Sequence, residues 1–406
     1  MATLDTRCGL RLERRAGVIQ FPVHYARGGT STGVIIDAAF APADMVAREE
    51  LLRHLLGVPQ RGTVARNSQI TGLGRGTATS NKAFLAHVET VDGRNRIVST
   101  LAQLAAAHAT VDWSVNCGNF SSALPLWAVD MGLGSGTRGD LEIDIRNTNT
   151  GVITTARLLR EGAGLRDVEI PGVQGAFPGV DLFLRAPVGA KTGTLLPTGR
   201  VVDDVLGVQV SCVDVAVPMV IIDAGSFGKS AWEEPAELEA DADFMRALRA
   251  VWIEAGVRMG LRKPDGELMS RDALAHSETI PKVCIVGKPR GGGAISVRYF
   301  TPQTAHASMA VSGGCCLAAA MLISGSIASR VAVGVAPPCE QDAEQVLGME
   351  NPAGVLEATV VARVASNRLE VTSVGYRRNA QILQRGHVPL YHASRHLDNA
   401  LSALMG

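Results

Sequence analysis

Two helical runs in this 406-residue chain are apolar on nearly every face. Residues 121–129 (SSALPLWAV) form the first run, and residues 317–323 (LAAAMLI) form the second. A helix without a polar face has to be surrounded by protein. Strand-like runs of alternating apolar and polar residues lie before and after each helix. The sequence therefore predicts an α+β fold of two pseudo-symmetric halves, each a mainly antiparallel β-sheet or barrel wrapped around a central buried helix.

Glycine and proline recur often in the middle of the chain, and we expect a change of domain there. We predict an N-terminal domain over residues 1–190, of which residues 1–17 form a loose arm, and a C-terminal domain over residues 191–375. Residues 376–406 are expected to pack back on the N-terminal domain. Within this C-terminal segment, the residues from Arg377 on are predicted to form a short helix.

Three further elements have clear local signals. Apolar residues recur at helical spacing from Asp44 until Gly57, which predicts a helix with one buried stripe. Residues 245–259 carry a second such stripe. Residues 141–146 and 152–159 read as strands, and the polar turn NTNTG at residues 147–151 joins them, so an antiparallel hairpin is predicted there.

The charge balance excludes several classes of partner. Lys and Arg number 39, as do Asp and Glu, so no overall field attracts nucleic acid or an anionic membrane. No run reaches the roughly 18 apolar residues of a membrane span. Residues 1–17 are basic and polar and lack the apolar core of a secretory signal. We expect a cytoplasmic protein, and the expected assembly is a homodimer or a homotetramer.

The seven cysteines are an odd number and are scattered without CxxC spacing. This pattern favours reduced thiols and argues against a disulfide framework or a zinc site. Three histidines near the C-terminus, His387, His392 and His396, have irregular spacing and no evident carboxylate partners for a metal site, so we interpret them as solvated side chains. No metal is expected.

The cysteine at position 117 stands out among the seven. It lies in the sequence NCGN at residues 116–119, directly before the first apolar helix. Unpaired N–H groups and the helix dipole favour negative charge at such a place. A thiolate or a substrate carboxylate would be stabilised there. A small buried cysteine in a turn is the alternative interpretation.

Two glycine-rich loops precede this cysteine. Residues 27–33 (RGGTSTG) follow a strand-like run and contain hydroxyl groups, so the loop is either an anion-binding turn or a plain hairpin loop. Residues 72–82 (GLGRGTATSNK) invite a nucleotide-binding interpretation. We reject it, because the glycines lack the G-x-G-x-x-G order and a strand-like run, residues 83–88, follows where a helix is needed.

Taken together, these motifs resemble the PrpF family. Residues 27–33 are similar to its RGGTSKG loop, residues 79–82 to its TSxK element and residues 116–119 to its NCGN element. The matching order continues through residues 147–151, 195–199, 306–316 and 376–388, so the resemblance spans residues 19–390. Two departures are Thr32, where lysine is usual, and Ser312-Gly313-Gly314 in place of Thr-Gly-Ala.

The resemblance implies a fold like that of diaminopimelate epimerase, with the site in a cleft between the halves. It implies Lys82 and Cys117 as the catalytic pair and no metal, nucleotide or pyridoxal cofactor. The ligand is expected to be a small polycarboxylate. The residues expected to bind it are Arg27, Thr30, Ser31, Ser80, Asn81, Asn116, Gly118, Asn119, Arg298, His306, Ser312, Gly313 and Gly314.

Members of the family include 4-oxalomesaconate tautomerases, aconitate isomerases and methylitaconate isomerases. The resemblance therefore implies a cofactor-independent isomerase that moves a double bond by 1,3-proton transfer in a small unsaturated di- or tricarboxylic acid. Lys82 can act as a base only where desolvation or a positive dipole lowers its pKa. Cys117 would then act as an acid or as a hydrogen-bond donor, and the direction of transfer stays open.

Three alternatives remain at this stage. Lys82 is a solvated lysine before a strand if it has no catalytic role. A two-cysteine racemase or epimerase would place Cys117 and either Cys315 or Cys316 on opposite sides of a carbon acid, which leaves Lys82 without a function. A non-catalytic accessory protein of a dehydratase in propionate/2-methylcitrate metabolism would use the same residues for binding alone.

Overall fold

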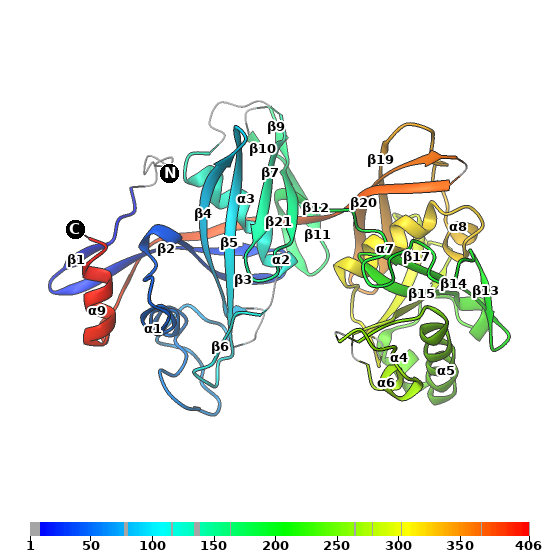
Figure 1. Ribbon diagram of the computed structural model, residues 1–406, viewed down its shortest axis with the longest axis horizontal. Helices are drawn as coiled ribbons and strands as arrows, with labels where there is room; N and C mark the ends of the chain where they lie inside the picture. The colour runs from blue at the N-terminus through cyan, green and yellow to red at the C-terminus, as the bar shows by residue number, and fades with distance from the viewer. Residues whose placement is uncertain are drawn as a thin grey trace. The chain divides into compact units, whose positions relative to one another are not determined.

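The computed structural model describes residues 9–76, 80–114, 117–133, 139–162, 164–263, 265–277, 279–301, 303–366 and 368–405. These residues form two compact units (Figure 1). Unit 1 holds the chain up to Glu169, the segment Val173–Leu182 and everything from Arg378 on. Unit 2 holds Ile170–Gly172 and Phe183–Arg377. The C-terminal segment thus returns to the unit that contains the start of the chain.

A mainly antiparallel sheet forms the body of unit 1. Its strands are β1 (Glu13–Arg15), β2 (Val18–Gly28), β3 (Ser31–Asp37), β4 (Lys82–Val91), β5 (Arg94–Leu104), β6 (Val111–Asp112), β7 (Leu141–Asn147), β8 (Ile153–Leu158), β11 (Asp167–Ile170), most of β12 (Val173–Arg185) and the end of β21 (Arg368–Pro389). Strands β9 (Arg160–Glu161) and β10 (Gly164–Leu165) form a separate two-stranded sheet. Hairpins join β2 to β3, β4 to β5 and β7 to β8, whereas β3–β4 and β5–β7 are parallel pairs. The predicted hairpin at residues 141–159 is confirmed.

Two consecutive short helices form the buried centre of unit 1. They are α2 (Gly118–Ser121) and α3 (Ala123–Asp130), and every residue of 123–128 is buried. Pro125 has no N–H to donate to Ser121, four residues earlier, which explains why one predicted helix is divided at Ser122. These helices pack against β2, β3, β5 and β8. The first predicted core helix is therefore buried.

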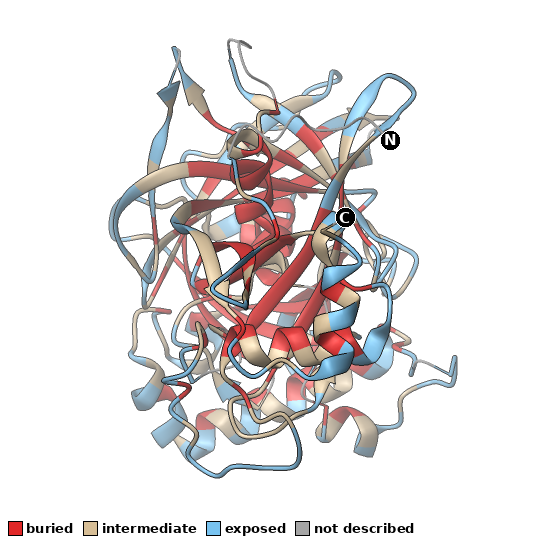
Figure 2. Cartoon of the chain, turned by 90° about the vertical axis from the view of Figure 1, so that its left-hand side faces the viewer, coloured by how far each residue is buried: buried red, intermediate tan, exposed pale blue. Residues whose placement is uncertain are grey.

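A second layer of unit 1 covers the sheet with α1 (Met45–Leu56) and α9 (Arg395–Ser402), and η1 (Ala38–Phe40) precedes α1. The carboxylate of Asp44 caps α1 by accepting from Ala47 N at 2.8 Å. Gly57 ends the helix in the left-handed conformation with φ 67°. The predicted helix is confirmed. Buried residues gather on the strands and the inner helix faces, and exposed residues lie mostly on loops (Figure 2).

Unit 2 repeats this plan around a single longer helix. Its strands are β13 (Asp203–Val205), β14 (Val208–Val215), β15 (Val217–Asp223), β16 (Lys282–Gly287), β17 (Ile295–Thr301), β18 (Thr304–Ala305), β19 (Ala343–Asn351), β20 (Gly354–Ala365) and the start of β21. Its helices are η3 (Ala224–Phe227), α4 (Pro235–Ala240), α5 (Ala242–Arg258), α6 (Arg271–Ala275), α7 (Val311–Met321) and α8 (Ile327–Val331). Residues 313–321 of α7 are all buried, and α7 packs against β14, β15, β19 and β20. The second predicted core helix is confirmed.

The prediction of a helix from Arg377 is wrong. Residues 368–389 form the single long strand β21, which pairs with β20 from Arg368 to Tyr376 and with β2 from Ala380 to Pro389. Its partners are distant in sequence, so their hydrogen bonds have no local signal. The C-terminal helix begins at Arg395. Among the described residues, no helix is long and apolar enough to cross a membrane.

Helix α5 offers a matched test of the unit 2 core. Leu248 on its inner face is 1% exposed, whereas Val257 on its outer face is 38% exposed. We expect Leu248→Ala to lower the free energy of unfolding by about 2–5 kcal/mol, because it removes buried methyl groups and leaves a cavity. Val257→Ala should stay within about 0.5 kcal/mol of wild type. Chemical denaturation measures both, and equal losses would contradict the packing described.

Candidate active site

Cys117 lies at the N-terminal cap of α2. Its sulfur accepts a hydrogen bond from Phe120 N at 3.5 Å, so the thiol occupies the position of a capping side chain. The Oγ of Ser31, at the start of β3, lies 3.7 Å from the same sulfur. The side chain is partly exposed. The structure thus joins the predicted hydroxyl loop and the predicted cysteine within unit 1.

Two glycines let the β2–β3 hairpin come this close. A Cβ atom at Gly28 would lie 2.6 Å from the backbone oxygen of Asn119. One at Gly33 would lie 2.3 Å from the backbone oxygen of Lys82 and 2.9 Å from the ring of Phe120. Any side chain at these positions would push the hairpin away from α2 and β4. The glycines of the loop therefore serve close packing between backbones.

Lys82 is the first residue of β4 and is only 4% exposed. Its Nζ donates a 2.6 Å hydrogen bond to Oε1 of Gln103 on β5. Burial lowers the pKa of Lys82, and the negative charge that Cys117 can carry opposes this shift. Lys82 is therefore no solvated lysine. A buried amine with a lowered pKa that interacts electrostatically with a thiol is suited to accept and return protons.

Asn119 has a defined side-chain orientation in the first turn of α2. Its Oδ1 accepts from Nε of the buried Arg378 at 2.7 Å, which leaves Nδ2 to donate to Thr30 Oγ1 at 3.2 Å. Gly118 precedes it and begins the helix. Thr30, Ser31, Cys117, Gly118 and Asn119 therefore lie around one turn.

The loop that leads into β4 is held by a buried amide pair. Nε2 of Gln69 donates to Asn81 Oδ1 at 2.8 Å and to Leu56 O at 2.7 Å. Asn81 is fully buried, and among the described residues its Nδ2 has no hydrogen-bond partner. Ser80 beside it is half-buried. The predicted residue Asn116 and Thr79 of the predicted motif lie outside the described residues.

Arg27 connects strand β2 to the end of strand β21 within unit 1. Its Nη1 donates to Gly29 O at 2.9 Å and to Asn379 Oδ1 at 2.7 Å, and its guanidinium lies 4.6 Å from the centre of the Phe177 ring. Burial lowers the pKa of Arg27. Thr32, the residue opposite Arg27 on β3, is half-buried. A lysine at position 32 would put a second cation beside Arg27.

Of the predicted residues of unit 2, Ser312, Gly313 and Gly314 lie in the first turn of α7, whereas Arg298 lies on β17. A Cβ at Gly313 would lie 2.4 Å from the ring of the buried Tyr299, so only glycine fits there, and Gly314 is packed against Leu356. Ser312 is half-buried. His306 Nδ1 accepts from Ser308 N at 2.9 Å, which places the proton of the neutral ring on Nε2.

His306 and Arg298 differ in the hydrogen bonds that their side-chain nitrogens make. Burial lowers the pKa of His306, so its neutral form, a donor at Nε2, is favoured. The guanidinium of Arg298 donates to the backbone oxygens of Glu233 and Val297, and it is 7% exposed. Its role in substrate binding stays a prediction.

Cys315 and Cys316 are buried inside α7. Their thiols donate to backbone oxygens, Cys315 to Gly375 at 3.8 Å and Cys316 to Val213 at 3.5 Å. Burial raises the pKa of Cys316 well above its usual range. A thiol of this kind does not form a thiolate near neutral pH. The two-cysteine alternative is therefore disfavoured by the environment of these residues.

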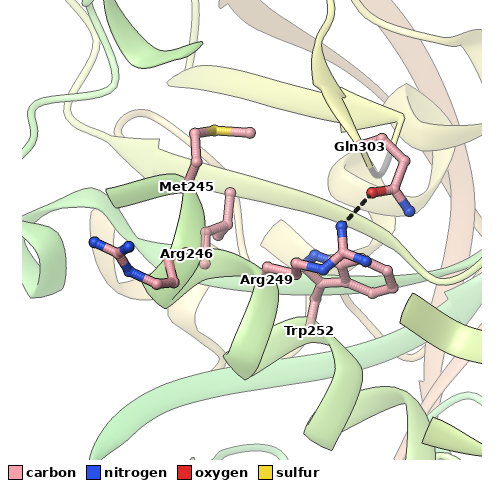
Figure 3. Close-up of a pocket in the computed structure, with 6 residues that line it drawn as sticks. Met245, Arg246, Arg249, Trp252 and Gln303 are labelled. Carbon is pink, nitrogen blue, oxygen red and sulfur yellow. Dashed lines mark hydrogen bonds between the residues drawn. The ribbon is translucent and has the colours of Figure 1, made fainter. Parts of the chain in front are cut away.

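A surface pocket elsewhere in unit 2 contains none of the predicted site residues (Figure 3). It lies between α5 and Gln303, and Arg249 Nη1 donates to Gln303 Oε1 at 2.7 Å across it. The guanidinium of Arg249 also donates to Ala275 O, so this cation makes its hydrogen bonds to residues of unit 2. Among the described residues, no three His, Cys, Asp or Glu side chains gather as metal ligands would.

Sequence reasoning missed Gln103 and Arg378. Gln103 lies opposite Lys82 in the β4–β5 register, and Arg378 reaches Asn119 from 259 residues away. The alternating pattern of residues 94–104 indicates a strand but not its register with β4. Arg378 was missed because its segment was predicted as a helix and because its contact with Asn119 is far away in the sequence.

Residues 18–391 match the sequence profile described as PrpF protein, so the chain belongs to the PrpF family. It is 32% identical to 4-oxalomesaconate tautomerase of Pseudomonas putida, covering 92% of this chain and 96% of that protein. It is 27% identical to 3-methylitaconate isomerase of Eubacterium barkeri, covering 91% and 97%. The crystal structure of methylitaconate-delta-isomerase matches with TM-score 0.76 and 25% identity over 95% of this chain and 97% of that one.

Thiol labelling tests the burial of the cysteines. Iodoacetamide should modify Cys117, which is partly exposed, and Cys339, which is exposed, in the native protein. Cys212, Cys284, Cys315 and Cys316 should react only after unfolding, because all four are buried. Burial raises the pKa of Cys212 to about 12 and raises the pKa of Cys284 and of Cys316 well above the usual range. Peptide mass spectrometry reports each site, and Cys339 is the internal control. Native labelling of Cys315 or Cys316 would restore the two-cysteine alternative.

Proposed function

We propose that this protein is a cofactor-independent isomerase that moves a carbon–carbon double bond in a small unsaturated di- or tricarboxylic acid. The main support is the state of Lys82. Its buried amine has a lowered pKa, donates a hydrogen bond to the side-chain amide of Gln103 and interacts electrostatically with Cys117. Relatives named for 4-oxalomesaconate, methylitaconate and 2-methylaconitate support the substrate class.

The reaction is a proton transfer with no net change in composition. A base removes a proton from an sp³ carbon next to the double bond, and the electron pair of that C–H bond moves into a dienolate conjugated with a carboxylate. A proton then returns to the carbon two positions away. The dienolate carries extra negative charge, so fixed donors must stabilise it.

Lys82 acts in this proposal as the proton shuttle and Cys117 as its partner. The amine needs its free-base form to take the proton, and burial makes that form available at lower pH than for an ordinary lysine. Cys117 supplies an acid or a hydrogen-bond donor on the same side of unit 1. Gln103 accepts a hydrogen bond from the Lys82 amine, and Ser31 and the N–H of Phe120 contact the sulfur of Cys117.

The carboxylates of the substrate are proposed to bind to donors of unit 1 near Cys117. Ser31 Oγ and the α2 turn at Gly118 and Asn119 supply O–H and N–H groups, and Arg378 fixes the amide of Asn119. The other predicted binding residues, including Asn81, Arg298, His306 and the α7 turn, stay predictions. Zero net charge means that affinity depends on such local donors.

An accessory role for a dehydratase is the second candidate, since binding alone would use the same donors. It does not explain why a lysine is buried beside a cysteine. Burial of an amine costs free energy and lowers its pKa, which serves proton transfer and not carboxylate binding. The isomerase proposal is therefore preferred.

Removal of either proposed catalytic group should abolish most turnover. We expect Lys82→Ala and Cys117→Ala each to stay folded and to lose about a hundred- to ten-thousand-fold in kcat, because each acts in proton transfer. Cys339→Ala, at an exposed thiol, is the control and should keep wild-type activity. The assay is isomerisation of the acids named above, followed by proton NMR. Losses below about tenfold, or less than about 1.4 kcal/mol, in both variants would contradict the assignment.

Binding should require more than one carboxylate. We expect aconitate, oxalomesaconate or methylitaconate analogues to bind more tightly than their mono-esters, because esterification removes a charge that the fixed donors hold. Calorimetry at moderate salt measures the difference. Equal affinity for acid and mono-ester, or a requirement for added metal, would argue against the proposed site.

A further inference from the structure

Lys82 has an unusual place among the lysines of the chain. The sequence contains six lysines, and Lys82 is the one that belongs to unit 1. Its Nζ donates to Gln103 Oε1 at 2.6 Å, and the two residues are direct partners in the antiparallel β4–β5 register. Neighbouring strands therefore fix both ends of this hydrogen bond.

We propose that Gln103 is a positioning residue for Lys82: the side-chain carbonyl of Gln103 holds Nζ in place without adding a negative charge to the site. The inference rests on the proposed role of Lys82 in proton transfer. It adds a residue to that role and explains why an amide stands at this position.

An amide oxygen suits a proton shuttle for a simple reason. It accepts a hydrogen bond from the ammonium form and from the neutral amine alike, because both forms carry N–H donors. The nitrogen therefore stays in place while its proton leaves and returns. A carboxylate at position 103 would pair with the ammonium and hold the proton. An apolar side chain would leave a buried donor without this acceptor.

The surroundings of Lys82 support an uncharged partner. Cys117, from the α2 cap, is a titratable group that acts on it electrostatically, and Ser31 of β3 lies against that thiol. Asp112 on β6 is the backbone partner of Gln103. Its carboxylate is used elsewhere, since Oδ1 accepts from Ser114 N at 2.8 Å and Ser114 Oγ at 2.7 Å.

Two substitutions of similar length test the inference. In Gln103→Glu the carboxylate should favour the ammonium, and in Gln103→Met the ammonium loses the amide oxygen as an acceptor. Gln384→Glu, at an exposed position on β21, adds the same charge to unit 1 and is the control. The Lys82 pKa is measured by NMR of ε-labelled lysine, where six lysines give a simple spectrum and Lys82→Ala assigns the signal.

We expect Gln103→Glu to raise the midpoint of the Lys82 NMR titration by about 1–3 pH units. Gln103→Met should lower this midpoint, and Gln384→Glu should leave it unchanged. The limb of the kcat/KM–pH profile that reports Lys82 should move in the same directions. A purely structural role for Gln103 would lower activity without opposite shifts. If Gln103→Met does not fold, the isosteric Gln103→Glu decides alone.

The results separate this inference from the proposed function. An unchanged Lys82 midpoint in Gln103→Glu overturns the inference, whatever the activity of Lys82→Ala. Full activity of Lys82→Ala overturns the role of Lys82 in catalysis. In that case a shifted midpoint in Gln103→Glu would show only that the hydrogen bond exists, and the positioning role would fall with the catalytic one.

Discussion

The site in unit 1 depends on the close approach of the β2–β3 hairpin to α2 and β4. Gly28 and Gly33 permit it, because a Cβ at either position would overlap the backbone of Asn119 or Lys82. The approach brings Ser31 to the sulfur of Cys117. It also sets Gly33 against the backbone of Lys82, whose pKa is lowered by burial of its amine. Close backbone packing therefore brings together the strands and the helix cap that carry Ser31, Lys82 and Cys117.

Much of the fold could be predicted because its main constraint is local. Runs such as LAAAMLI have no polar face, so α3 and α7 had to be buried, and the alternation around residues 147–151 fixed a hairpin. Strand β21 could not be predicted, since β2 and β20 pair with it from far along the chain. Cys117 was singled out by its place before an apolar helix, and the family motifs added Lys82 as its catalytic partner. Gln103 and Arg378 depend on register and on long-range contact, which a single sequence does not contain.

The chemistry of the cysteines separates two kinds of carbon-acid catalysis. A two-cysteine mechanism needs two thiols that ionise, but Cys316 is buried and its raised pKa keeps the proton on sulfur. Unit 1 instead combines one partly exposed thiol with a buried amine. An amine and a thiol can exchange roles as base and acid within one turnover. This pairing suits removal and return of a proton at different carbons of the same substrate.

The most direct test of proton transfer is isomerisation in deuterated water, followed by proton NMR across a panel of unsaturated di- and tricarboxylic acids. The account predicts that one acid is isomerised and that deuterium enters at the carbon that receives the proton. It also predicts that Lys82→Ala loses both isomerisation and exchange. Failure of the wild-type protein to exchange or isomerise any acid of the panel would contradict it, and so would unchanged exchange in Lys82→Ala.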